Sequence, residues 1–368
     1  MRSRLALGMT CAAVLALFIP SAISADSDDW DIKLLTSPSS WERVYPNNLN
    51  RHGKIVGFWE AGTQADGTYE IHAICWEDHD SSPVELEELP GDDQCWAADV
   101  NKKGMICGSS GGGLPKGVIW DAEGDPKNVH PEGDEYVWSQ VWSLDDKGNG
   151  CGSMATTSGM RPWYWSEDGT SKQMPFDTDD YWGGIAFSVN EMGMVSGMLW
   201  DKSAAPYWSH AVFWTKKGEL VEIHDDVDDA VDGDVTWSFA WEATDVGEIA
   251  GECGTTDGDV IAWVWSKDGV EILDADDELA AVAWQSDGRF VVGAVGGDSI
   301  DFSTATASVW VRDEDDDEVT WTLEKVPALT GYDGMITIGA NKKGEFAGAA
   351  AASDGTIRAW YAEYDDDD

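Results

Sequence analysis

The chain has few basic residues, and this shortage limits what it can bind. Its 368 residues include 23 Lys and Arg against 70 Asp and Glu, which gives a net charge of −47 at pH 7. Such a surface repels the phosphates of nucleic acids and of anionic membranes. We therefore expect no nucleic-acid partner and no membrane insertion. Most of the acids fit a protein that stays hydrated in high salt, where screening relieves their mutual repulsion.

Recognisable catalytic and metal-binding motifs are also absent. No Cys and His have zinc-ligand spacing, no G-x-S-x-G elbow occurs, and the six His are scattered along the chain. The six Arg that follow residue 25 are too few for an arginine cluster that would hold a carboxylated sugar. Five Cys follow residue 25, an odd number, so at least one thiol stays unpaired, and buried free thiols are expected.

Long apolar runs are missing apart from one near the N-terminus. Arg2 and Arg4 precede an apolar stretch at 5–20, which leads into small residues. This pattern is typical of a secretory signal peptide covering residues 1–25, with cleavage after Ser24 or Ala25. The stretch is too short to span a membrane comfortably. We expect a secreted or periplasmic protein.

A helical period is absent as well, whereas a short glycine motif recurs seven times. Without a helical period, an α-solenoid is excluded. The motif G-x-x-x-G follows a turn that opens with a polar residue, and its copies are 41 to 56 residues apart, a spacing typical of propellers and solenoids. The copies begin at Gly53, Gly104, Gly148, Gly193, Gly247, Gly288 and Gly344, the sixth with one extra residue before its second glycine and with its turn placed at QSDG, 285–288.

Each copy lies in the same frame of four short apolar runs. One run precedes the turn, one follows it, a third ends in Trp in six copies, and a fourth follows a D-G or K-G turn. Asn or Asp opening a turn and Gly closing it are typical of β-hairpins. We therefore predict an all-β fold, a seven-bladed β-propeller of four-stranded antiparallel blades.

The predicted propeller is one domain, residues 26–364, followed by an acidic tail at 365–368. Its last unit lacks a fourth strand, and the run at 30–35 is expected to supply it and to close the last blade. The Trp residues that end strand three are expected to pack between blades. The approximate units are 41–90, 91–133, 134–177, 178–230, 231–277, 278–327 and 328–364 with 30–35.

The connections of such a fold alternate between two faces. Tight turns join strand one to two and strand three to four on a face rich in Lys, the tight-turn face. Longer connections share the opposite, long-loop face, where variable loops on a rigid scaffold commonly bind ligands. Acids and Trp gather there ahead of strand one: Trp96, Trp138, Trp182, Trp237, Asp93, Asp134, Asp180 and Asp234.

Two interpretations of these residues are open. Aromatic rings stack on sugars and attract cations, and carboxylates accept hydrogen bonds or coordinate Ca²⁺, so an acidic aromatic funnel would bind a carbohydrate, a cation or a basic protein. Alternatively, the Trp residues pack and the Asp residues hydrate the loops. No cofactor is expected apart from Ca²⁺ as a candidate, and no catalytic residue is identified.

The first residue of strand three is basic in five of the seven copies. In so acidic a chain, ion pairs between a blade and the loop of its neighbour would explain the recurrence. A ring of anion-binding positions is the alternative, and it adds Arg161 and His210 to the candidate site.

The repeat has a fixed order of motifs: N-x-x-G-x-x-x-G, then [RHK]-A-x-x-W, then a D-G or K-G turn. This order resembles the HAF-repeat family of bacterial extracellular proteins. The likeness covers nearly all of the chain after residue 25, and the fifth and sixth copies depart most from it. It implies a secreted repeat protein, without an activity or catalytic residues to carry over.

These observations favour an exported, acidic, non-catalytic β-propeller that serves as a binding or interaction module and is a monomer. The alternative is a polysaccharide-acting enzyme, a glycoside hydrolase or lyase with carboxylates in the central funnel, because such carboxylate pairs need no local motif. A structural surface or matrix protein is a further alternative.

Overall fold

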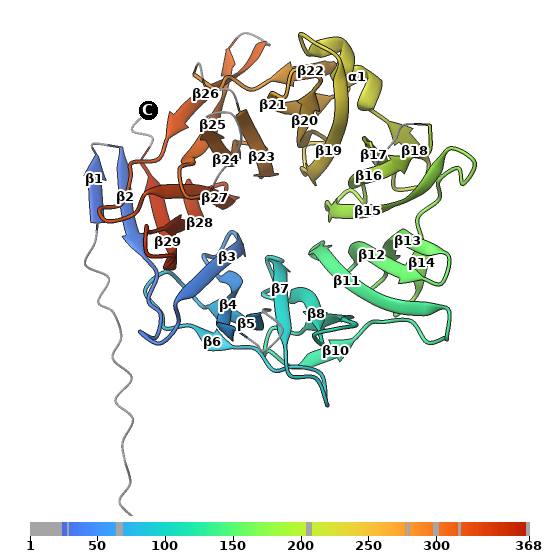
Figure 1. Ribbon diagram of the computed structural model, residues 1–368, viewed down its shortest axis with the longest axis horizontal. Coiled ribbons are helices and arrows are strands. Elements are labelled where there is room, and N and C mark those ends of the chain that lie inside the picture. Colours follow the sequence, from blue (N-terminus) through green and yellow to red (C-terminus); the bar gives the residue numbers. More distant parts are fainter. Residues whose placement is uncertain are drawn as a thin grey trace, which may run out of the picture.

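The computed structural model shows an all-β protein whose short antiparallel sheets surround a common centre (Figure 1). It describes residues 24–27, 29–63, 69–203, 208–276, 278, 280–296, 302–315 and 318–365. The predicted signal peptide lies outside the described residues except for its last two positions, which belong to β1, Ser24–Ser27. Most of the predicted acidic tail also lies outside them. No helix in the described part of the chain has the length and apolar character needed to cross a bilayer.

The strands pair in sets of four that follow one another along the chain, and we call each set a unit. Units one to three are β3 (Arg43–Leu49), β4 (Ile55–Thr63), β5 (Tyr69–Trp76), β6 (Val84–Glu85); β7 (Cys95–Val100), β8 (Ile106–Ser110), β9 (Lys116–Trp120), β10 (Pro126–Asn128); and β11 (Tyr136–Leu144), β12 (Gly150–Thr156), β13 (Gly159–Trp165), β14 (Ser171–Gln173). Units four and five are β15 (Tyr181–Val189), β16 (Val195–Asp201), β17 (Ser209–Trp214), β18 (Leu220–Glu222); and β19 (Val235–Ala243), β20 (Ile249–Thr255), β21 (Val260–Ser266), β22 (Gly269–Ile272). Unit six is β23 (Ala280–Ser286), β24 (Phe290–Gly296), β25 (Thr306–Asp315), β26 (Glu318–Lys325), and unit seven is β27 (Gly334–Asn341), β28 (Glu345–Ala351), β29 (Ile357–Tyr364) with β2 (Trp30–Leu34). A short helix, α1 (His224–Ala230), lies between β18 and β19.

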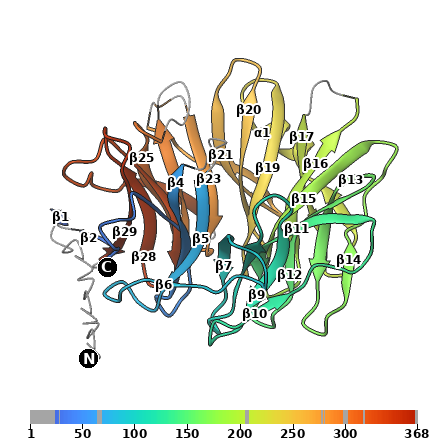
Figure 2. The ribbon, with the colours of Figure 1, turned by 60° about the horizontal axis from the view of Figure 1, so that its bottom comes forward.

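Strand one of every unit lies nearest the centre. Figure 1 shows β3, β7, β11, β15, β19, β23 and β27 around the middle, and Figure 2 shows the sheets standing side by side around it. Strand one therefore places its two ends at the centres of the two faces, so its side chains decide what the protein presents there.

A β-bulge interrupts strand one of every unit, and it explains the second glycine of the motif. In unit two the register shifts between Ala97 and Asp99, opposite Gly108. A Cβ on Gly108 would lie 1.8 Å from the carbonyl oxygen of Trp96, which no side chain can tolerate. The second glycine of each other copy faces a strand-one carbonyl in the same way, at Gly57, Gly152, Gly197, Gly251, Gly293 and Gly348. The glycine motif thus keeps strand two close to a bulged strand one.

The turn of unit six differs from its predicted position. Asp287, and not Gln285, takes the role of the opening Asn, because its Oδ1 accepts the N–H groups of Arg289 and Phe290. The Asp287 N–H donates to the Phe290 carbonyl, so Gly288 and Arg289 form a two-residue hairpin loop. The placement of the turn at 285–288 was therefore wrong by two residues, and Gln285 belongs to strand one.

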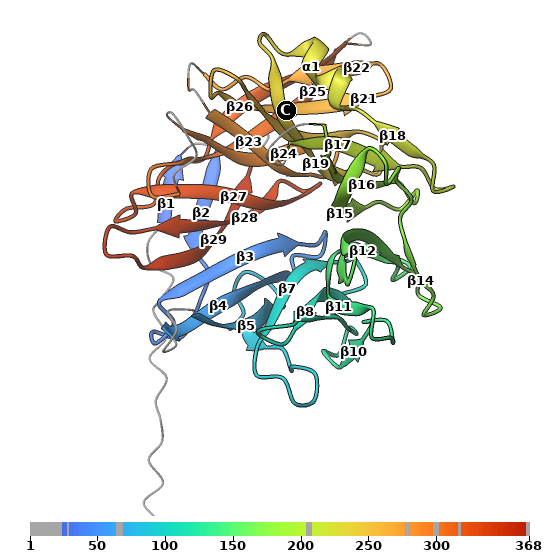
Figure 3. The ribbon, with the colours of Figure 1, turned by 45° about the vertical axis from the view of Figure 1, so that its right-hand side comes forward.

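The two ends of the chain meet in one sheet. Strand β2 pairs antiparallel with β29, with Trp30 opposite Tyr364, the pairing that the sequence predicts for 30–35. β29 also forms one parallel bridge with β3, between Ile357 and Arg43. Figures 1 and 3 show β2 beside β29, with β3 next to that sheet. The first and last units are therefore joined through the backbone.

The Trp residues that end strand three pack in the core, as predicted. Trp76, Trp120, Trp165, Trp214 and Trp310 are buried, and each indole N–H donates to a backbone carbonyl of a connecting segment. Trp265 is partly exposed, and its N–H binds the Asp226 carboxylate at 3.0 Å. The expectation of buried free thiols is also confirmed, at Cys75, Cys95, Cys107, Cys151 and Cys253.

Candidate functional site

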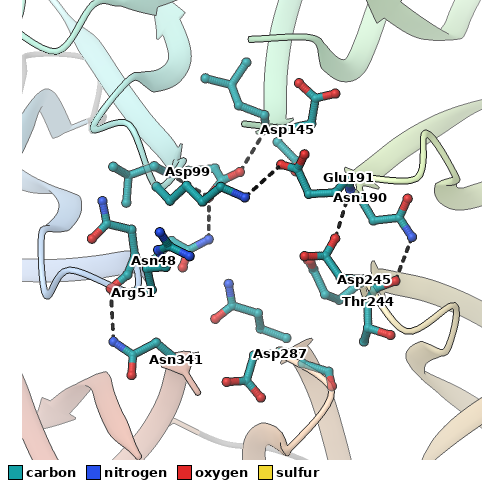
Figure 4. A pocket seen from close by; sticks show the side chains of 18 of the residues that line it. Asn48, Arg51, Asp99, Asp145, Asn190, Glu191, Thr244, Asp245, Asp287 and Asn341 are labelled. Carbon is teal, nitrogen blue, oxygen red and sulfur yellow. Dashed lines mark hydrogen bonds and ion pairs between the residues drawn. The ribbon is translucent and has the colours of Figure 1, made fainter. Parts of the chain in front are cut away.

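A cavity of about 280 Å³ opens at the centre of the tight-turn face (Figure 4). The ends of the strands one and the turns that follow them line it, so every unit contributes. Its lining includes Asn48, Asp99, Asp145, Asn190, Glu242, Asp287 and Asn341. We call it the central cavity. It lies on the face opposite to the one where the sequence analysis placed the candidate site.

Carboxylates, Asp99 buried and Glu242 half-buried, form the inner wall of the central cavity. Asp99 accepts hydrogen bonds from the Asn48 amide and from the N–H groups of Val100 and Leu144, yet burial still raises its pKa. Burial also raises the pKa of Glu242 well above its usual value. Both lie two residues before their turn, directly after the bulge. The cavity therefore holds carboxyl groups that ionise less readily than they would in water.

Asparagine side chains link neighbouring turns around the cavity mouth at four places. The Asn50 amide donates to the Asn101 carbonyl at 2.9 Å, and the Asn101 amide donates to the Asp145 carbonyl at 3.0 Å. Asn190 makes the same bond to Thr244, and Asn341 makes it to Asn50 at 3.0 Å. Asp and Thr lack an N–H₂ donor, so Asp145 and Thr244 cannot continue the pattern with their side chains.

In units two to five, the next residue of the turn forms a second, charged ladder on the rim. The N–H of Lys102 donates to Asp146 at 3.0 Å, that of Asp146 to Glu191, and that of Glu191 to Asp245 at 2.9 Å. The Lys102 ammonium contacts Asp146 and lies 3.9 Å from Glu191. These interactions neutralise part of the acidic rim and fix the turns of units two to five relative to one another.

A second cavity, about 370 Å³, lies on the long-loop side between units one, two and three. We call it the aromatic pocket. Phe58, Trp96 and Trp142 supply aromatic surface, while Gln94 and Gln140 supply amide groups. Trp96 and Trp142 are both partly exposed, with ring centroids 5.0 Å apart and an angle of 72° between the rings. Trp96, one of the predicted Trp residues, lines this pocket.

Aromatic residues at the bulge continue from this pocket along the inner strands. Trp142 packs near Phe187, with centroids 6.1 Å apart, and Phe187 packs against Trp241 at 4.2 Å. These residues lie three positions before the turn, as does Trp284 once unit six is aligned on Asp287. Sequence reasoning missed them because it searched ahead of strand one. The recurrence of Trp or Phe at that position in four units is the signal that could have found them.

The other predicted residues of the long-loop face do not converge on one site. Asp93, Asp134, Asp180 and Asp234 are all exposed, each in a different unit. Trp182 is 62% exposed, with the Lys202 ammonium 5.1 Å from its ring centroid. Trp138 is partly exposed. Trp237 packs on backbone, because a Cβ on Gly254 would lie 2.2 Å from its indole nitrogen. These four Asp and three Trp residues are spread around the face.

The basic residues of strand three do not form the expected ion pairs between neighbouring units. His72 lies 3.5 Å from Glu88, Lys116 lies 3.5 Å from Asp92, and His210 lies 3.5 Å from Asp201, all within one unit. Arg161 and Arg358 do reach the next unit, where they donate to the carbonyls of Trp182 and Glu42. A guanidinium can satisfy carbonyl oxygens where no carboxylate is near, so the contacts across units are hydrogen bonds to the backbone.

His210 belongs to a polar cluster between units four and five. Its ring stacks on His224, with centroids 4.0 Å apart and an angle of 7°, and its Nδ1 lies 3.5 Å from the Tyr181 hydroxyl. His224 Nδ1 lies 2.7 Å from Ser238 Oγ, which accepts the N–H of Ala211. Burial lowers the pKa of His224 to about 4, so the ring is neutral at pH 7.

Part of this cluster repeats elsewhere. His130 Nδ1 lies 2.8 Å from Ser139 Oγ, which accepts the N–H of Gly117. In both places the His lies in the connection between two units, and the Ser lies on strand one of the later unit. The Ser hydroxyl joins this strand to strand three of the earlier unit. The His–Ser pair is therefore a structural device, whereas Tyr181 and His210 are particular to unit four. Among the described residues no group of three or more His, Cys, Asp and Glu has a geometry that could hold a metal ion.

Comparisons with known proteins support the fold. No family model matches the chain, and no curated protein matches it. Among solved structures, the acylaminoacyl peptidase of Pyrococcus horikoshii gives a TM-score of 0.53 at 11% identity, covering 88% of this chain and 52% of the peptidase. Prolyl oligopeptidase B from Galerina marginata gives 0.51 at 12% identity, covering 87% and 48%. This chain matches about half of the length of each. At such identities the likeness concerns the fold alone, which is propeller-like and all-β.

Proposed function

We propose that the chain is a seven-bladed β-propeller, closed by β2, that binds carbohydrate in the aromatic pocket of its long-loop face. The pairing of β2 with β29 and the bridge between β29 and β3 support the closed ring. The resemblance to HAF-repeat proteins and the N-terminal segment support export. The protein is then a binding module that acts outside the cytoplasm.

The aromatic pocket carries this proposal. A sugar ring offers apolar C–H faces and a rim of hydroxyl groups. Trp96 and Trp142 offer ring faces for the former, while Gln94 and Gln140 offer both donors and acceptors for the latter. The 370 Å³ of the pocket lies within the range of small-ligand sites. Neutral sugars also avoid the repulsion that an acidic chain exerts on anions.

A glycan array followed by titration calorimetry tests this proposal. Gln94→Ala together with Gln140→Ala removes the amide groups and leaves the aromatic packing, so we expect at least a tenfold loss of affinity for the glycan that binds. Trp182→Ala, an exposed Trp outside the pocket, is the matched control and retains binding. A glycan that binds both variants equally well would place the site elsewhere, and silence across the array would refute carbohydrate binding.

Tyr181 and His210 favour one second candidate, a polysaccharide-acting enzyme. The Tyr181 hydroxyl and His210 Nδ1 lie 3.5 Å apart on the long-loop side, a pair suited to moving a proton. Burial raises the pKa of Tyr181, so the phenol is protonated at neutral pH. This candidate would be established if the wild type turns over the bound glycan, whereas Tyr181→Phe binds the glycan without turnover. Binding without turnover would refute the enzyme and agree with the binding module.

A further inference from the structure

The fourth strand of unit six is longer than the fourth strands of the other units. β26 has eight residues, whereas β6, β10, β14, β18 and β22 have two to four. It pairs with β25 alone and ends its sheet, on the outer side of unit six in Figure 1. The five-residue β2 of unit seven is covered by β1. Among the described strands, β26 is therefore the longest open edge on the outer side of the molecule.

The backbone groups on the outer side of β26 have no partner among the described residues. The Val326 N–H donates to the Ala307 carbonyl at 2.9 Å, and the register along β26 has no bulge. In an antiparallel pair, alternate residues turn their backbone groups toward the partner strand. Those of Val319, Trp321 and Leu323 therefore point away from β25. An uncovered edge of this kind is a template for one more strand.

The side chains of β26 do not protect this edge. Edge strands are commonly interrupted by Pro, by a bulge or by a charge, and 319–323 has none of these. Its sequence, Val-Thr-Trp-Thr-Leu, favours extended backbone. Trp321 and Leu323 pack on the core between units five and six, whereas Thr320 and Thr322 are exposed on the other face. One face of an added strand would thus lie toward unit five.

A cavity of about 760 Å³ lies between units five and six beside this edge, and we call it the outer groove. Its apolar lining comes from both units: Val264, Trp265, Val270, Val319 and Trp321. A strand added to β26 would turn every second side chain toward the same side as Val319 and Trp321. The backbone edge would then supply affinity, and the outer groove would receive the alternate side chains.

The charges around the edge favour a basic partner. The six residues 313–318, at the turn between β25 and β26, are all acidic, and Glu314 is 67% exposed. The bases that line the outer groove already lie near acids, because Arg312 binds Glu248 at 2.7 Å and Lys267 lies 3.9 Å from Asp268. A second copy of the chain would bring a further net charge of −47, which this acidic edge repels.

We propose that β26 binds an extended, basic peptide segment of a partner protein as an additional strand of unit six, with alternate apolar side chains in the outer groove. A polypeptide carries backbone donors and acceptors at the spacing that this edge presents, which selects a peptide over other polymers. The surface lies between units five and six, away from the aromatic pocket of units one to three. It is independent of carbohydrate binding.

Titration calorimetry in moderate salt tests the proposal with an end-capped probe peptide of alternating Lys and Val residues. We expect saturable one-to-one binding and slower amide hydrogen exchange at 319–323. A peptide of alternating Glu and Val should bind at least tenfold more weakly. Val319→Pro removes an outward N–H and keeps the pairing with β25, so it should weaken binding at least tenfold. Thr322→Ser, which changes an exposed side chain of the same strand, is the matched control and should bind like the wild type.

Modified probes test the backbone pairing without altering the protein. One probe is N-methylated on its Val residues and the other on its Lys residues, so the two lack donors on opposite backbone edges. We expect one of them to lose affinity at least tenfold, because a single edge of the probe faces β26.

Four outcomes would overturn the proposal. The first is an absence of saturable binding of the Lys and Val probe. The second is that both N-methylated probes bind as tightly as the unmodified one, which would mean attraction by charge alone. The third is unchanged binding to Val319→Pro protein that melts like the wild type. The fourth is a dimer, seen by light scattering, that Val319→Pro dissociates, because a second copy would then occupy the edge. Glycan binding by the same samples shows that the long-loop face remains intact.

Discussion

The side-chain amide of Asn341 donates a 3.0 Å hydrogen bond to the backbone carbonyl of Asn50, 291 positions earlier in the chain. The same bond joins Asn50 to Asn101 and Asn101 to Asp145, so the last unit is linked to the first as consecutive units are linked to each other. The Asn side chain that shapes the turn of one unit therefore also holds that unit to its neighbour.

Replacing Asn341 with Asp should weaken this link. The Oδ1 acceptor for the Lys343 N–H remains, but the donor to Asn50 is lost and a buried charge is added beside Glu345. We expect a loss of about 1–3 kcal/mol in the free energy of unfolding, measured with urea. Asn128→Asp, which keeps its own turn bond to His130 and has no bond across units, is the control. Equal stability of the two variants would contradict a role for the link.

The close approach of strands one and two should make Gly108 irreplaceable. Ala at this position places its Cβ 1.8 Å from the Trp96 carbonyl oxygen, so backbone must move. We expect Gly108→Ala to cost about 3 kcal/mol or more, or to prevent folding. Gly113→Ala, where no atom lies within 4 Å of the added Cβ, should melt within a few degrees of the wild type. A mild effect at Gly108 would mean that the bulge can relax.

Glu252 should make stability fall as pH rises. It lies on β20, its Oε2 has no hydrogen-bond partner, and burial raises its pKa from 4.5 to about 7. Below pH 4.5 both folded and unfolded states are protonated. Between pH 4.5 and 7 the unfolded state ionises first, which lowers the free energy of unfolding by about 3 kcal/mol. The free energy of unfolding of Glu252→Gln should therefore exceed that of the wild type by more at pH 8 than at pH 4. Parallel pH profiles of the two proteins would contradict this.

His224 should act in the opposite direction. Burial, followed by the charge of His210, lowers its pKa from 6.5 to about 4, so the folded state resists its protonation. Its stabilising contribution is complete above pH 6.5 and is lost as pH falls toward 4. His224→Gln should show a shallower loss of melting temperature over this range than the wild type. Lys217→Gln, an exposed substitution of the preceding turn, should follow the wild-type profile.

Two predicted binding residues should respond differently to truncation. Trp182 is 62% exposed, so Trp182→Ala should change the free energy of unfolding by about 0.5 kcal/mol or less. Trp237 packs on Gly254 and lies 4.9 Å from the ring of Phe239, so Trp237→Ala should cost about 2 kcal/mol. Chemical denaturation of both variants measures the two changes in the free energy of unfolding. A large loss for Trp182→Ala would show packing that its exposure conceals.

The candidate sites show where sequence reasoning stops. It found Trp96, because that residue stands beside acidic loop residues at the start of strand one. It missed Trp142 and Trp241, because it searched ahead of strand one, whereas these residues lie at the bulge, three positions before the turn. It misplaced the turn of unit six, since Ser286 and Asp287 both suit a turn and hydrogen bonding to the following N–H groups decides between them.

The sequence by itself determined the all-β class, the four-strand repeat, the buried Trp at the end of strand three and the pairing of the N-terminal strand with β29. Those features follow from local chemistry, that is, from turn residues, alternating apolar runs and a glycine wherever backbones must meet closely. The tertiary structure decided which side chains share a cavity. Arg51, Glu242 and Asp287 are far apart in the chain, and they border one space because every unit directs the end of its first strand to the same centre.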